Sequence, residues 1–216
     1  MKRKGILFVF SAPSGAGKTT ICKEVLKSDK NLKFSVSYTS RPKRQDEING
    51  ESYWFVTREK FEKMIITKKF VEWAEVHGNY YGSPREYINK TIKNGIDILL
   101  DIDVQGGMNI RRLYRDNSVL IFILPPSFKK LEQRLKKRKT DSCDVIARRL
   151  ENAKKEIISL PHYDYFVIND NLDEAISNVM NIITVERMKI KYYDFSKLKS
   201  VEKLKFTDLK DYFRYF

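Results

Sequence analysis

Residues 11–20, SAPSGAGKTT, nearly match the phosphate-binding pattern G-x-x-x-x-G-K-[ST]. In loops of this kind, consecutive backbone N–H groups surround the phosphates at the start of a helix, where the helix dipole also favours negative charge. The glycines permit close turns, the lysine is expected to reach the terminal phosphates, and the last hydroxyl is expected to bind Mg²⁺. The residues expected around a nucleoside triphosphate are Ser14, Gly15, Ala16, Gly17, Lys18, Thr19 and Thr20.

Ala12 stands where the pattern has its first glycine. A methyl group is tolerated there if the residue keeps a negative φ, because only the left-handed region disfavours a side chain. The alternative is an ordinary Gly-Ser turn between a strand and a helix. A nucleotide-binding loop by itself is typical of GTPases, ATPase motors and small-molecule kinases alike.

Alternating strands and helices are expected to position this loop. GILFVFS is a continuous apolar run that ends in turn residues, which is typical of a strand buried on both faces of a parallel sheet. Similar runs occur at 96–103, 118–124 and 165–169, and helical patterns occur at 84–93, 105–114, 143–158 and 173–189. This order predicts an α/β fold, a parallel sheet flanked by helices.

Two segments interrupt the alternation. Residues 35–82 contain short alternating strands and one short helix, which predicts a small mixed α/β lobe inserted into the core. Residues 127–149 carry nine Lys and Arg against three Asp and Glu, as expected for a helical lid over a polyphosphate or for a solvated helix pair. The predicted core comprises 1–34, 83–126 and 150–190, and the predicted amphipathic helical extension comprises 191–216.

Length and composition set broader bounds. A chain of 216 residues predicts one core with small lobes, and its net charge of +14 favours polyanionic partners unless the lysines are simply solvated. Cys22 and Cys143 form neither a disulfide framework nor a metal spacing, which favours a reduced, cytoplasmic setting. The apolar run after MKRK leads directly into the loop, so we interpret it as a strand rather than a signal peptide. No apolar run approaches the roughly 20 residues of a membrane span.

Four further motifs, SVSYTSRPKRQDEINGESYWF, EWAEVHGNYYGS, LLDIDVQG and FILPPS, follow the loop in order. Together with the basic segment, they resemble guanylate kinases from about Lys4 to about Met188. The resemblance implies a P-loop core with a GMP-binding lobe and a mobile lid, which transfers phosphate from Mg·ATP to GMP or dGMP. It also implies a monomer or homodimer with no nucleic-acid or membrane partner.

The side chains of the lobe suit GMP chemically. Two guanidiniums and two phenols can surround a dianionic phosphate, and one carboxylate can accept hydrogen bonds from both N1–H and the 2-amino group of guanine, a pair that adenine lacks. The resemblance assigns the phosphate to Arg41, Arg44, Tyr53 and Tyr81, the base to Ser37, Glu72 and Asp103, and a further GMP contact to Ser83. The alternatives are surface charges in a turn for the arginines and an exposed strand face for Glu72.

Asp101 and Asp103 follow an apolar run at the carboxyl end of a predicted strand, where alternation sends both side chains toward the nucleotide cleft. We expect Asp101 to act on Mg²⁺ through water, together with Thr19. The resemblance places Asn169 near the adenine and places Arg134, Arg138 and Arg149 on the ATP phosphates. Phosphoryl transfer depends on positioning and charge compensation, so we expect no dedicated general base. The predicted catalytic set is therefore Lys18, Arg41, Arg134, Arg138 and Arg149.

The chain departs from the usual family pattern at three positions. Besides Ala12, Ser40 stands where threonine is common before Arg41, and Asp46 stands near a usual glycine.

The sequence leaves two alternatives to a kinase. One is a kinase-like module that has lost catalysis and binds proteins, although such modules usually lack an intact phosphate loop. The other is nucleic-acid binding by the basic segment or by the aromatic-rich tail.

Overall fold

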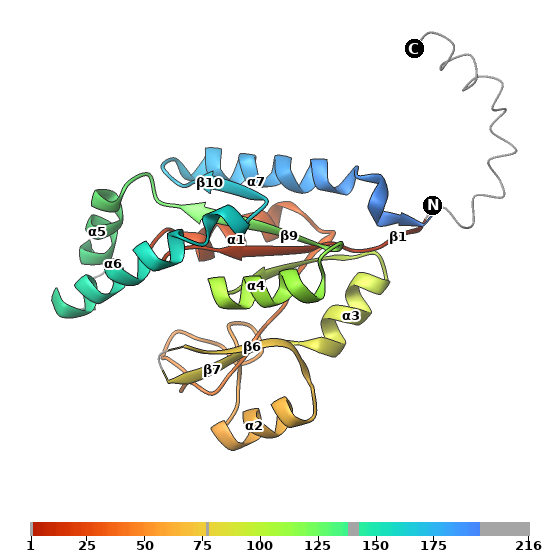
Figure 1. Ribbon diagram of the computed structural model, residues 1–216, viewed down its shortest axis with the longest axis horizontal. Coiled ribbons are helices and arrows are strands. Elements are labelled where there is room, and N and C mark those ends of the chain that lie inside the picture. Colours follow the sequence, from red (N-terminus) through yellow and green to blue (C-terminus); the bar gives the residue numbers. More distant parts are fainter. Residues whose placement is uncertain (1, 77, 138–142, 195–216) are drawn as a thin grey trace, which may run out of the picture.

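The computed structural model describes residues 2–76, 78–137 and 143–194, and a five-stranded parallel sheet forms its centre (Figure 1). From edge to edge the strands are β10 (Tyr165–Ile168), β9 (Ser118–Leu124), β2 (Leu7–Ser11), β8 (Asp97–Asp101) and β3 (Leu32–Phe34). All four neighbouring pairs run parallel, and parallel strands need crossover connections, which helices provide here. The predicted fold class is confirmed.

The central strand β2 is buried on both faces, as its continuous apolar run predicts. Phe8 and Phe10 belong to one apolar cluster, and Leu7 and Val9 belong to the other, because successive side chains of a strand point to opposite faces. Helices α1 (Lys18–Ser28) and α7 (Leu172–Arg187) pack on the phenylalanine face, and α3 (Arg85–Lys93) and α4 (Val104–Leu113) pack on the opposite face.

A second, mixed sheet forms the inserted lobe below the core in Figure 1. Its strands, in spatial order, are β5 (Trp54–Phe55), β4 (Tyr38–Thr39), β7 (Asn79–Pro84) and β6 (Phe70–Val76), with α2 (Arg58–Ile66) between β5 and β6 in the chain. The side chain of Thr57 caps α2 by accepting from the N–H of Lys60, as expected of an N-cap threonine. Phe61 is fully buried and stacks on Phe70, which fixes the helix to the sheet.

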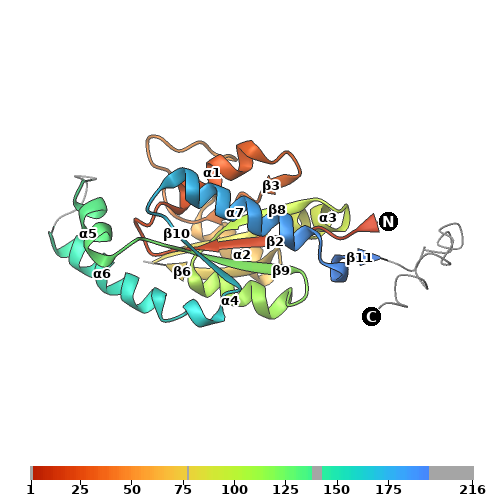
Figure 2. The same ribbon diagram turned by 90° about the horizontal axis from the view of Figure 1, so that it is seen from above.

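Two basic helices, α5 (Phe128–Lys137) and α6 (Cys143–Ile157), project from one end of the molecule (Figure 2). They pack on each other through an apolar cluster of Leu131, Leu135, Ile146 and Ala153. The 3₁₀ turn η1 (Leu160–His162) then leads into β10.

The predicted elements agree with the structure to within one to three residues at each end, and the differences lie in fraying termini. Two pairings were not expected. The edge strand β3 pairs with β8, and β1 (Lys2–Arg3) forms an antiparallel ribbon with β11 (Tyr193–Asp194) after the 3₁₀ turn η2 (Ile190–Tyr192). Thus the first residues of the predicted 191–216 extension are a turn and a strand rather than an α-helix, and 195–216 lie outside the described residues. None of the described helices is both long and apolar enough to cross a bilayer.

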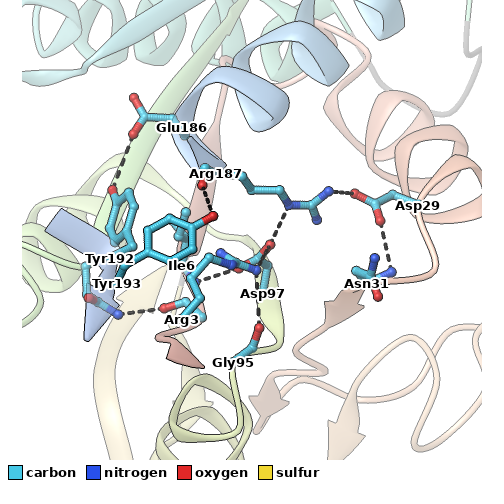
Figure 3. Close-up of polar contacts among 12 residues, drawn as sticks. Arg3, Ile6, Asp29, Asn31, Gly95, Asp97, Glu186, Arg187, Tyr192 and Tyr193 are labelled. Carbon is cyan, nitrogen blue, oxygen red and sulfur yellow. Dashed lines mark hydrogen bonds and ion pairs between the residues drawn. The ribbon is translucent and has the colours of Figure 1, made fainter. Parts of the chain in front are cut away.

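An ion-pair network ties this ribbon to the amino-terminal ends of the core strands (Figure 3). Asp97, at the start of β8, is fully buried and accepts from Arg3 Nη1 at 2.8 Å and from Arg187 Nε at 2.7 Å. Arg187 also pairs with Asp29, at 2.6 Å between Nη1 and Oδ2. Because the two carboxylates are buried and share one guanidinium, they depend on it for charge compensation.

Replacing Arg187 with alanine is expected to lower the free energy of unfolding by about 3 kcal/mol, because Asp29 and Asp97 would lose their shared cation. Equilibrium urea denaturation measures the change. Lys27→Ala is the control, because its pair with Glu24 lies on the surface and is worth less than about 1 kcal/mol. Equal losses in the two variants would contradict a stabilising role for the network.

Candidate active site

The loop between β2 and α1 makes two left-handed turns, at Gly15 (φ 96°) and at Gly17 (φ 93°). A Cβ atom on Gly17 would lie only 2.3 Å from Nδ2 of Asn169, so a larger residue does not fit without a rearrangement. Among the described residues, Lys68 is the only non-glycine residue with a positive φ. Ala12 therefore keeps a negative φ, and its methyl group is accommodated as the sequence analysis required.

Asn169, at the end of β10, is buried and braces this loop. Its Nδ2 donates to the carbonyl of Ala16 at 2.7 Å, and Nη2 of Arg134 on α5 donates to the carbonyl of Asn169 at 2.8 Å. A cavity of about 380 Å³ opens beside the loop, lined by Gly15, Gly17, Thr20, Arg134, Lys137, Asn169, Asp170 and Leu172. The structure thus brings five residues predicted for ATP to one cavity: Gly15, Gly17, Thr20, Arg134 and Asn169.

Lys18 and Thr19 at the start of α1 meet Asp101 at the end of β8. The register of β2 and β8 places Phe10 opposite Asp101, so the loop begins beside this carboxylate. Lys18 Nζ lies 2.7 Å from Asp101 Oδ1, and Thr19 Oγ1 donates to Oδ2 at 3.4 Å. Burial by itself would lower the pKa of Lys18, but the charge and hydrogen bond of Asp101 outweigh it and the pKa is raised. The ammonium therefore stays charged.

A second cluster lies in the lobe around Arg41. Its Nη2 pairs with Glu47 Oε1 at 2.5 Å, and its guanidinium carbon lies 5.6 Å from the ring centroid of Tyr53. The rings of Tyr53 and Tyr81 meet edge to face at 5.8 Å. The hydrogen bond to Glu47 raises the pKa of Arg41, and burial raises the pKa of Tyr53 to about 12, so one side chain is a cation and the other a neutral donor at neutral pH.

Arg44 has a different environment from Arg41. Its side chain is exposed, and its backbone N–H donates to Glu47 Oε2 at 2.8 Å. Glu47 therefore binds both arginine positions of the turn at once. Glu47 was not among the residues predicted from the sequence; the available signal was an acid three residues after Arg44 in a charged turn.

Glu72, on β6, is buried, which excludes an exposed strand face. The pairing of β6 with β7 sets it opposite Ser83, whose hydroxyl donates to Glu72 Oε1 at 2.5 Å. Burial raises the pKa of Glu72 to about 7, the nearby charge of Asp103 adds to this, and the Ser83 hydrogen bond opposes it.

Glu72 and Asp103 converge on the first turn of α4. A Cβ atom on Gly106 would lie 2.9 Å from Glu72 Oε2 and 3.2 Å from Asp103 Oδ1. Asp103 Oδ1 accepts from the N–H of Gly106 at 2.8 Å, so it also caps the helix, a function that the sequence analysis did not assign to it. Ser37, buried just before β4, is the remaining residue predicted for the base.

The structure describes two of the three arginines predicted for the lid, Arg134 and Arg149. Arg134 lies against the loop, as given above, and Arg149 is half-buried on α6. Arg138 lies outside the described residues.

Two side chains near the loop, Glu156 and Tyr163, each have a buried oxygen atom, and neither was predicted from the sequence. Glu156 is one of three acids in α6 and Tyr163 lies in a turn, so neither carries a sequence signal for this position.

The comparisons with known proteins agree with this geometry. A family model described as guanylate kinase matches residues 4–186. The chain belongs to the guanylate kinase family. The resemblance inferred from the sequence motifs is thereby confirmed.

Individual relatives match over most of their length. The guanylate kinase of Carboxydothermus hydrogenoformans is 44% identical over 195 residues, which cover 90% of this chain and 95% of the relative. That of Syntrophotalea carbinolica is 48% identical over 86% of this chain and 88% of the relative. The crystal structure of guanylate kinase from Anaplasma phagocytophilum aligns with a TM-score of 0.79 at 33% identity, and the match covers 93% of this chain and 95% of that one.

Gly17→Ala is expected to abolish nucleotide binding at the loop, because the new methyl group would displace Asn169 and strain a left-handed residue. Calorimetric titration with MgATP measures the loss. Gly78→Ala is the matched control, since Gly78 has a similar φ of 77° but open space around its Cβ position. This control is expected to bind MgATP normally. Normal binding by Gly17→Ala would contradict the tight loop geometry.

Proposed function

We propose that this protein transfers the γ-phosphate of ATP to GMP, giving ADP and GDP. The observation that carries the proposal is the buried carboxylate of Glu72, held by Ser83 beside Asp103 at the start of α4. A carboxylate in this position can accept from N1–H and the 2-amino group of guanine together. Adenine would leave it unpaired, and losses of that kind produce discrimination of roughly 10⁴ to 10⁵.

The donor site is the loop and the cavity next to it. The loop residues 14–20 would bind the phosphates of ATP through backbone N–H groups, and the cavity beside Asn169 and Arg134 would take the nucleoside part. Lys18 would contact the terminal phosphates, since its charge is secured by Asp101.

The residues beside the loop suit Mg²⁺. The ion prefers oxygen ligands and usually keeps several waters, and the Thr19 hydroxyl and the Asp101 carboxylate offer two oxygens next to each other. Thr19 would bind the ion directly and Asp101 through water. Bound Mg²⁺ supplies charge neutralisation for the phosphates during transfer.

The acceptor site is the lobe. Arg41 is held in place by Glu47 and would pair with the GMP phosphate, together with the exposed Arg44. The hydroxyls of Tyr53 and Tyr81 would add neutral donors. Ser37 and Asp103 would complete the binding of the base, and Ser83 would contact GMP as well as orienting Glu72.

Transfer would then depend on charge placed around the moving phosphoryl group. Lys18 and Arg134 lie at the loop, and Arg41 lies in the lobe. Arg149 and Arg138 would add charge when core, lobe and lid enclose the substrates and exclude water.

We assign the core to 1–34, 83–126 and 150–190, the lobe to 35–82, the lid to 127–149 and the extension to 191–216. We place the protein in the cytoplasm, as a monomer or homodimer that acts on GMP or dGMP.

The first experiment is a coupled assay of ADP formation with ATP and Mg²⁺, in which GMP and AMP are offered separately. We expect turnover with GMP and almost none with AMP. Glu72→Gln is expected to lose at least about 10²-fold in kcat/KM for GMP, because the guanine donors would face an amide that has only one acceptor oxygen. Glu75→Gln, an exposed acid on the same strand, is the control and should keep its activity. Absence of turnover from folded, ATP-binding protein would overturn the proposal.

The same carboxylate predicts a pH dependence of GMP use. Guanine donors bind the ionised form of Glu72, and the pKa of this carboxyl is raised to about 7 in the free protein. Therefore kcat/KM for GMP should be constant well above pH 7 and should fall about tenfold per pH unit below it. A pH profile of wild type and Glu72→Gln tests this. Titration of the GMP phosphate remains in both profiles, so a wild-type profile of the same shape as that of the variant would contradict the assignment.

A further inference from the structure

Glu156 lies near the end of α6 and has no function in the scheme above. Its Oε2 atom is buried and has no hydrogen-bond partner among the described residues. Buried polar atoms of native proteins are nearly always hydrogen-bonded, so an unpaired carboxylate oxygen calls for an explanation.

The packing of α6 places this carboxylate at the phosphate-binding loop. Ala153, one turn before Glu156, belongs to the cluster that α6 forms with Leu131 and Leu135 of α5. These two leucines lie against Gly15, since a Cβ atom there would be 3.1 Å and 2.9 Å from their methyl carbons. The inward face of α6 therefore continues onto the loop, and Glu156 is the acid on that face.

Four charged or polar groups interact with Glu156. The backbone N–H of Ser14 and the ammonium of Lys18 favour its ionised form, and Asp103 disfavours it. Tyr163, before β10, presents a second buried polar atom, its hydroxyl; burial raises the pKa of Tyr163 to about 12, and the charge of Glu156 adds a small part of this rise. Burial is the largest influence and raises the pKa of Glu156 to about 6.

The two groups that favour the ionised carboxylate are groups that the loop would offer to phosphate. A phosphate bound by Ser14 and Lys18 would bring negative charge next to Glu156, and like charges at close range disfavour each other's ionised form. An anion already beside these donors must therefore weaken phosphate binding unless it takes up a proton.

We propose that Glu156 sets the affinity of the loop for ATP, because its carboxylate competes with the phosphates for the N–H of Ser14 and the ammonium of Lys18. This inference rests on the proposed binding of ATP at the loop. Phosphate binding raises the proton affinity of Glu156, so MgATP binding takes up a proton from solvent and strengthens as the pH falls toward 6. Glu156 thus limits how tightly the loop binds its nucleotide, which must leave the loop as ADP after transfer.

The test is calorimetric titration of MgATP into wild type and Glu156→Gln without GMP, which excludes any contribution of the Glu72 site. At pH 7.5 the glutamine variant is expected to bind about tenfold more tightly, since an uncharged neighbour no longer opposes the phosphates. Between pH 7.5 and 6 wild type should gain more affinity than the variant does, because only wild type has this carboxylate to protonate. Glu151→Gln, an exposed acid on the same helix, should match wild type.

Thermal unfolding of each variant shows whether a change in affinity reflects a change in fold. Unchanged or weaker MgATP binding by folded Glu156→Gln overturns the inference, as does equal pH dependence in the two proteins. Absence of MgATP binding by folded wild type overturns it as well. A wild-type protein that binds MgATP but does not phosphorylate GMP would instead overturn the proposed function and leave the comparison of affinities intact.

Discussion

The ion pair between Lys18 and Asp101 is the contact on which the site depends. It joins the first residue of α1 to the last residue of β8, and it forms because β2 and β8 are parallel neighbours in register. Without this carboxylate, desolvation would lower the pKa of the half-buried Lys18 ammonium instead of leaving it raised. The parallel sheet is therefore what makes the loop an anion site, because it brings the carboxyl ends of two strands together.

The acidic side chains of the site have two effects: one fixes a cation in place, and two others change charge when a ligand binds. Glu47 fixes the guanidinium of Arg41 so that little conformational entropy remains to be lost when an anion binds. Glu72 is instead buried and Glu156 is half-buried, each with few donors, and the pKa of each is raised, to about 7 and about 6. Their charge therefore responds to the ligand donors or anions that bind, whereas Asp101 is already paired with Lys18.

The opposite edge of the core sheet is organised for stability rather than for binding. Arg187 joins Asp97 and Asp29, and Asp97 also holds Arg3, so the ends of β8, α1 and α7 and the β1–β11 ribbon are linked by charge (Figure 3). This leaves the carboxyl edge free for loops and for the helices α5 and α6; the contacts of α5 with the phosphate-binding loop run through Leu131, Leu135 and Arg134. A firm amino-terminal edge and a loop-rich carboxyl edge are the usual division in sheets of this kind.

The sequence by itself determined the α/β core, the inserted lobe and most of the residues gathered at the site. Their signals are local: the loop pattern at 11–20, continuous apolar runs for buried strands, and the acid Glu72 between apolar residues of a predicted strand. Tertiary structure alone decided the partners of those residues. Glu47 beneath Arg41 depends on the fold of a turn, and Glu156 at the loop and Asp97 in its network depend on strand register and helix packing between distant segments. Periodicity along one segment reports which face is buried, but not which polar group from another segment that face will meet.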